Sequence, residues 1–154
     1  MKHILKKAQL IEKLYKNPDT IPAGKTFDDL YDSLAFIGGL QRGLLLLKKH
    51  DPETIDHAIM FLKADPYFFR SGYIKEEFAD LLKKAPLGKK QISELQDALI
   101  ATIQKESRRE YRSYCKLAAK IADHKFRQRV QNIIDTSESA QRVQHAQWML
   151  DTLK

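Results

Sequence analysis

Apolar residues recur at intervals of three and four along almost the whole chain of 154 residues. This spacing places them on one side of an α-helix, because a helix has about 3.6 residues per turn. A regular alternation of apolar and polar residues, which marks a half-buried strand, extends over no useful length. The sequence therefore predicts an all-α fold built from amphipathic helices.

Proline and its capping neighbours mark where several of these helices begin or end. Asn17-Pro18 ends the first helix, because the residue before a proline disfavours the α conformation. Asp51-Pro52-Glu53 is a helix start, with a capping side chain, a proline at the first position and an acid in the first turn. Asp65-Pro66 carries the same start signal, and segment 65–73 is expected to form one helical turn or a tight corner.

The remaining helix boundaries are less sharply marked. Thr26 is expected to cap a helix that continues through Leu44–Leu47, a stretch that is apolar all round and is typical of the most buried helix. From residue 89 onward the chain has no proline and predicts several helices in succession. Their boundaries fall near Ser107 and Asp123-His124, and Ser137 is expected to cap the last one.

Helices of about 12 to 20 residues joined by short turns favour antiparallel packing of neighbours. These lengths, with the starts at Asp51-Pro52 and Asp65-Pro66 and the helix end at Pro86, resemble HEAT-like and armadillo-like repeat proteins over residues 26–154. An irregular helix bundle shares these features. The resemblance implies a scaffold that binds proteins or nucleic acids through a face or groove, and it implies no chemistry. The length predicts a single domain over residues 1–154.

Composition limits the cellular compartments in which we expect the chain to be found. Its one cysteine, Cys115, allows no disulfide within the chain, which favours a reducing compartment, and we expect a cytoplasmic protein. Lys6 and Lys7 interrupt the first apolar segment, so this segment indicates a helix and not a secretory signal. The longest uninterrupted apolar run is far shorter than the roughly 20 residues that span a bilayer, so no membrane partner is expected.

Charge is concentrated in one short stretch of the chain. The net charge is +7, and residues 105–129 hold nine basic and three acidic residues. Basic residues spaced four apart on a helix form a ridge beside its apolar face. The ridge defines the first candidate binding site: Arg108, Arg109, Arg112, Lys116 and Lys120. The ridge has two interpretations. The first is a solvated face, balanced by counterions or paired to acids elsewhere in the chain, such as those between Asp28 and Asp56. The second is a site for an anionic partner, either a phosphate backbone or an acidic protein surface.

The second candidate binding site is an aromatic corner within residues 65–73, where Tyr67, Arg70 and Tyr73 lie beside Phe68 and Phe69. Such a cluster is more often a staple between helices than a binding site. If part of it is exposed, Tyr67 and Arg70 are residue types that anchor protein interfaces, and aromatic rings beside a guanidinium also stack on unpaired bases.

The sequence offers no recognisable catalytic, metal or cofactor site. Gly38-Gly39 and Gly43 lie in a leucine-rich helix and do not form a phosphate-binding loop. His50 and His57 are seven residues apart, which does not match the helical zinc motifs. Cys115 lies on the apolar side of its helix, so we expect it to be buried and inert. We therefore expect no cofactor, no metal and no enzymatic activity.

Two functions from different classes remain open, beside a third and weaker option, an enzyme whose site the sequence does not reveal. The first is a non-enzymatic protein–protein interaction module, such as an adaptor, an inhibitor or a toxin-neutralising immunity protein. The alternative is nucleic-acid backbone binding through the basic segment 105–129, which requires only Lys and Arg at a suitable pitch. Salt dependence separates them, because phosphate contacts weaken steeply with salt and a hydrophobic protein interface does not.

Overall fold

A computed structural model describes residues 1–23 and 38–154, and within this part of the chain the fold is all-α with no strand. The expected cap at Thr26 and the acids between residues 28 and 32 lie outside the described residues. The helices are α1 (Lys2–Lys16), a 3-10 turn η1 (Pro18–Thr20), α3 (Leu40–Lys48), α4 (Pro52–Ala64), α5 (Ser71–Leu82), α6 (Lys89–Ile103), α7 (Tyr111–Ile121), α8 (His124–Thr136) and α9 (Ala140–Thr152).

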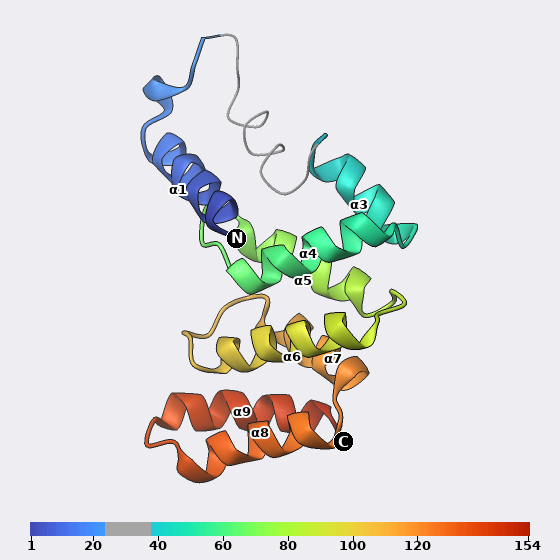
Figure 1. Cartoon of the computed structure of the whole chain (residues 1–154). Helices are drawn as coiled ribbons and strands as arrows, with labels where there is room; N and C mark the ends of the chain where they lie inside the picture. The colour runs from blue at the N-terminus through green and yellow to red at the C-terminus, as the bar shows by residue number, and fades with distance from the viewer. Residues whose placement is uncertain (24–37) are drawn as a thin grey trace.

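Helix hairpins stack in layers from α4 to the C-terminus (Figure 1). Each layer is a pair of consecutive helices, α4 with α5, α6 with α7, and α8 with α9. The first helix of each pair contacts the first helix of the next, and the second helices α5, α7 and α9 form a parallel row of contacts. α1 and α3 pack at the α4–α5 end, and the pair α8–α9 forms the opposite end (Figure 1).

Capping side chains confirm two helix starts that the sequence predicts. The Asp51 carboxylate accepts from the Thr54 backbone N–H at 3.0 Å, with Pro52 at the first helical position. Asp123 accepts from the Phe126 N–H at 2.7 Å and caps α8. Each cap satisfies an N–H group that has no partner inside the helix, which contributes about 1 kcal/mol.

Four expectations about individual helices are wrong. Gly38-Gly39 do not lie in a helix, because both glycines have positive φ (88° and 100°) and α3 begins after them, at Leu40. Asp65-Pro66 does not start a helix, because Asp65 is the left-handed C-cap of α4 and its carboxylate pairs with cations, so α5 begins only at Ser71. The last helix is capped by Ser139, whose hydroxyl accepts from the Arg142 N–H, and not by Ser137. The stretch Leu44–Leu47 is not the most buried helix, since Leu45 is exposed on α3 near one end of the stack.

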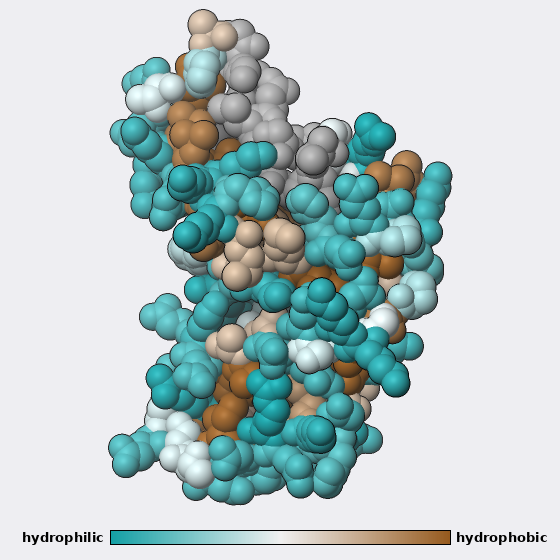
Figure 2. Space-filling view, in the orientation of Figure 1, coloured by the Kyte–Doolittle hydropathy of each residue, from teal (hydrophilic) through white to brown (hydrophobic). Residues whose placement is uncertain are grey.

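One continuous apolar core runs through the layers. Its largest fully buried side chains come from α1 and from α3 to α8, and they include Ile4, Leu47, Phe61, Phe78 and Phe126. In Figure 2 most of the visible face is hydrophilic, and hydrophobic side chains show along α1 and in smaller patches over the lower layers. Within the described residues, no helix combines the length and the apolar character needed to cross a membrane.

Candidate functional site

The turn between α4 and α5 brings aromatic and charged side chains to one corner of the molecule. Both of its ends, Asp65 and Arg70, adopt the left-handed conformation, with φ of 45° and 60°. This conformation costs a non-glycine residue roughly 1–2 kcal/mol. Contacts around the corner must therefore offset the strain.

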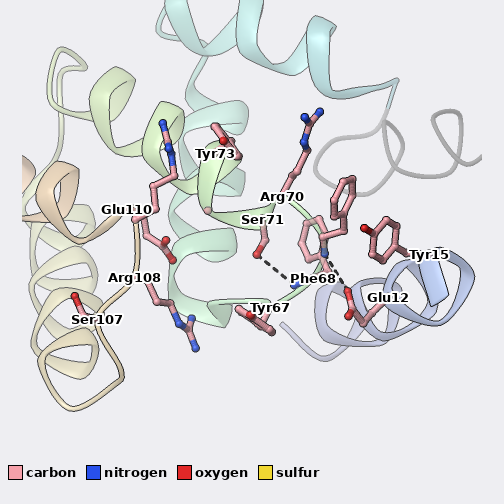
Figure 3. A pocket seen from close by; sticks show the side chains of 13 residues that line it. Glu12, Tyr15, Tyr67, Phe68, Arg70, Ser71, Tyr73, Ser107, Arg108 and Glu110 are labelled. Atoms are coloured by element: carbon pink, nitrogen blue, oxygen red, sulfur yellow. Dashed lines mark hydrogen bonds between the residues drawn. The ribbon is translucent and has the colours of Figure 1, made fainter.

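Two phenylalanines hold the corner in place. Phe68 is buried and meets the ring of Phe61 edge-on, with centroids 6.4 Å apart. Phe69 stacks on Tyr15 of α1 at 4.0 Å, and its backbone N–H donates to the Glu12 carboxylate at 3.0 Å (Figure 3). The corner thus fastens α1 to the α4–α5 pair, and this part of the aromatic cluster is a structural staple.

The two tyrosines of the corner face solvent and lie under cations. Tyr67 is 73% exposed and Tyr73 is 53% exposed. The guanidinium of Arg108 lies over the Tyr67 ring at 5.0 Å from its centroid, and that of Arg109 lies over Tyr73 at 4.1 Å. Arg70 is 5.9 Å from the Tyr73 centroid. The structure therefore brings the aromatic corner and the start of the basic ridge together.

A buried ion network lies next to these rings. The side chain of Lys75, on α5, is 0% exposed and donates to Asp65 at 2.6 Å and to Glu110 at 3.4 Å. Lys105 and Arg108, from the loop between α6 and α7, also pair with Asp65, whose side chain is 5% exposed. Three cations thus surround two buried carboxylates and hold the α6–α7 loop against the corner.

Opposing effects act on the carboxyl group of Asp65. Burial disfavours its charged form and raises its pKa, but the nearby Lys75 and Lys105 outweigh burial, so the pKa lies below the ordinary value of 3.8. Asp65 is therefore ionised at neutral pH and keeps its three cationic partners.

Gly72 and Tyr114 border the same network from α5 and α7. A Cβ atom at Gly72 would lie 2.9 Å from Oε2 of Glu110, so only glycine permits this close approach without a shift. The Tyr114 hydroxyl is buried and has no hydrogen-bond partner among the described protein atoms. Burial, with Asp65 and Glu110 nearby, holds the pKa of Tyr114 well above its usual range, so the phenol stays protonated.

The start of α7 divides the basic ridge in two. Arg108 and Arg109 were expected on the helix, but they lie in the preceding loop because α7 begins at Tyr111. Arg108 pairs with Asp65, and the Nε of Arg109 donates to Glu76 at 2.9 Å. Acids elsewhere in the chain do neutralise this half of the ridge. They are Asp65 of the corner and Glu76 of α5, and neither belongs to the Asp28–Asp56 region.

The second half of the ridge is differently placed. Arg112, Lys116 and Lys120 are exposed along α7, one helical turn apart, as the sequence predicts. None of them forms an ion pair with an acid of residues 1–23 or 38–154. These three cations are therefore available to an anionic partner.

A groove between α7 and α9 begins at this half of the ridge. We call it the α7–α9 groove; its volume is about 440 Å³, and no acidic side chain is among the described residues that line it. Its lining residues are Ser107, Arg108, Arg109, Tyr111, Arg112, Cys115, Lys116, Trp148 and Thr152. A second groove, at the aromatic corner, shares Ser107, Arg108 and Arg109 with it as a common wall.

Trp148 supplies the aromatic surface of the α7–α9 groove. Its side chain is 46% exposed, and its ring lies 5.6 Å from that of His145, which in turn lies 4.9 Å from Tyr111. The hydroxyl of Tyr111 donates to the His145 carbonyl at 2.6 Å and fixes the inner end of this stack. The indole is therefore held from below while part of its surface remains open to a ligand.

This arrangement is suited to binding and not to nucleophilic chemistry. Burial raises the pKa of the Cys115 thiol to about 11, so the thiolate that would react is scarce at neutral pH. Among the described residues, no three His, Cys, Asp or Glu side chains gather as a metal site would require. Cations and an open indole instead suit a ligand that carries both negative charge and planar rings.

Sequence reasoning missed Trp148 and the ion network. Trp148 had one available signal, because it is the only tryptophan and lies one position away from the apolar residue Met149, on the edge of the buried stripe of α9. No sequence signal indicated the ion network, since Asp65 and Arg108 are separated by 43 residues and only the layered packing joins them.

Comparison with known proteins finds no family model, curated protein or solved structure that matches this chain.

Proposed function

We propose that this chain is a non-enzymatic, cytoplasmic nucleic-acid-binding module of HEAT-like architecture, which contacts phosphates through α7. One observation carries the proposal: Arg112, Lys116 and Lys120 project from α7 without acidic partners in the described chain, beside a groove lined by cations. Arg and Lys that face solvent at helical spacing neutralise phosphates and release counterions, which drives binding.

The charge distribution supports this surface over the rest of the ridge. Like charges four residues apart repel by a few tenths of a kcal/mol per pair, and no intramolecular ion pair among the described residues offsets that repulsion for Arg112, Lys116 and Lys120. A bound phosphate chain would offset it. Arg108 and Arg109 instead position the loop, because their guanidiniums are committed to Asp65 and Glu76.

The test is fluorescence anisotropy with labelled DNA and RNA at low and near-physiological salt. The variant is Arg112→Gln, Lys116→Gln, Lys120→Gln, and the matched control is Lys84→Gln, Lys89→Gln, Lys90→Gln, which removes the same charge from exposed positions elsewhere. We expect the α7 variant to lose at least about tenfold in affinity and the logarithmic salt slope to fall by about 2 to 3, roughly one per lost contact. The control should change little.

Two outcomes would overturn the proposal. One is the absence of binding at low salt. The other is an equal loss in both triple variants, which would show a response to net charge and not to a surface on α7.

A second candidate is a protein partner, of the adaptor or inhibitor kind, at the aromatic corner. The observation in its favour is the exposure of Tyr67 and Tyr73 beside Arg70, in a groove of about 480 Å³ that also contains Glu12 and Glu110. Tyr and Arg anchors in a groove of mixed charge are typical of protein interfaces. A complex that Tyr67→Ala with Tyr73→Ala abolishes, and that the α7 triple variant leaves intact at physiological salt, would support this candidate over the first.

A further inference from the structure

We infer that the nucleic acid bound at α7 is single-stranded and that one unpaired base stacks on Trp148 in the α7–α9 groove. This inference rests on the proposed function and adds the form of the ligand and the residue that selects it. It follows from the volume of the groove, the position of the indole and the absence of acids from the described lining.

The indole is placed as a stacking platform. Trp148 is the only tryptophan in the chain and lies on an exposed helix face, where burial does not explain so large an apolar side chain. His145 and Tyr111 support it from the core side, which restricts the motion of the ring and lowers the entropy lost on binding. A rigid, half-open aromatic surface is what base stacking requires.

The groove is also of suitable size and charge for a nucleotide. Its volume of about 440 Å³ lies in the range of small-molecule sites. Arg112 and Lys116 line the groove together with the indole, so a base on the ring and its phosphate on the cations occupy one site. An acidic peptide would satisfy the cations but would leave the indole without a planar partner.

A duplex does not fit this arrangement. Its bases are stacked on one another, so their faces reach an indole only after unpairing and unstacking, which costs a few kcal/mol. A single strand exposes these faces and also bends easily. Beyond the groove, the shared wall of Arg108 and Arg109 leads to the exposed rings of Tyr67 and Tyr73, which offer the next stacking surface along the strand.

Trp148 provides the readout, because the intrinsic tryptophan emission of this chain comes from it alone. The wild-type protein is titrated with three unlabelled ligands of equal length: oligothymidylate, the corresponding abasic deoxyribose-phosphate strand, and a duplex. Anisotropy with labelled copies of each ligand measures binding independently of the indole.

We expect oligothymidylate to quench the tryptophan emission at the concentrations at which it binds. We expect the abasic strand to bind at least about fivefold more weakly, with unchanged emission. A loss of this size corresponds to the lower end of the free energy of one base–aromatic stack.

Two variants of Trp148 distinguish the stacking of a base on the ring from contact with a large apolar side chain. Trp148→Phe keeps an aromatic face and should bind oligothymidylate close to the wild-type affinity. Trp148→Leu keeps apolar bulk without a ring and should lose the preference for oligothymidylate over the abasic strand. Circular dichroism and thermal unfolding of both variants check that α9 remains folded, so that a loss of binding is not a loss of structure.

The outcomes distinguish the inference from the function on which it rests. Equal binding of the abasic strand with silent tryptophan emission overturns the stacking inference and leaves backbone binding at α7 intact. Equal or tighter binding of the duplex also overturns it, as does polyglutamate that quenches Trp148 at the same concentrations, because that result assigns the groove to an acidic protein. Failure of every nucleic acid to bind overturns both.

Discussion

The guanidinium carbon of Arg109 lies 4.1 Å from the centre of the Tyr73 ring. The same side chain donates from Nε to Glu76, which is one helical turn further along α5. These contacts join the α6–α7 loop to α5 and link the basic and aromatic segments, which the sequence presents as separate features. The loop that forms the wall between the two grooves is therefore fixed by the layer beneath it.

The pairing of Arg109 with Tyr73 should be measurable as a coupling energy. A double-mutant cycle with Arg109→Ala and Tyr73→Leu is expected to give about 0.5–1 kcal/mol, the range for a cation over an exposed ring. Urea denaturation of the four proteins measures it. Strictly additive effects of the two changes would contradict the geometry, and Arg109→Lys should retain only part of the coupling because Lys lacks the planar group.

Removal of the buried ammonium group should be far more costly than removal of an exposed one. Lys75→Met leaves Glu110 buried without its cation, and we expect the free energy of unfolding to fall by about 3–5 kcal/mol. The matched control is Lys63→Met, which breaks a pair with Glu94 whose side chains are 34% and 35% exposed, and it should cost at most about 1 kcal/mol. Similar losses in the two variants, measured by chemical denaturation, would argue against the buried network.

Acid should weaken the protein partly through Asp65. Because the folded state holds the pKa of this carboxyl below 3.8, its contribution to stability is present above that value and is lost as pH falls through the folded pKa. Asp65→Asn keeps a side chain that tolerates the left-handed backbone but removes the charge. The difference in the free energy of unfolding between wild type and variant should narrow from pH 7 to pH 3. A constant difference would exclude this role for Asp65.

The thiol of Cys115 should react only when the structure opens. With its pKa raised to about 11 and its side chain buried, modification by an aromatic disulfide reagent at pH 8 is expected to be slow. The rate should increase by orders of magnitude in denaturant. Equally rapid labelling in both conditions would place the thiol at the surface. Since the chain has one cysteine, the reaction reports on α7 without further substitutions.

Sequence patterns predicted the local structure better than the assembled site. Asp51-Pro52 was interpreted correctly because the Asp51 carboxylate accepts from the N–H of Thr54, three residues further on, a contact that depends on short-range geometry alone. The same dipeptide at Asp65-Pro66 was misinterpreted, because the partners of Asp65 come from α5 and from the α6–α7 loop. Lys116 and Lys120 lie exposed on α7 as their spacing predicts, whereas the role of Arg108 was set by an acid 43 residues earlier.

The α7–α9 groove exists only while the last hairpin, α8–α9, is packed against α7. In such a stack each layer is held only by its neighbours, so the terminal pair α8–α9 opens at a lower free energy than the whole molecule. On such an opening Trp148 would separate from Arg112, whereas the corner at Asp65, which lies in the other layers, would remain assembled. The ligand that we propose between α7 and α9 would therefore stabilise this end of the stack, and we expect hydrogen exchange in α9 to slow on binding while that in α4 stays constant.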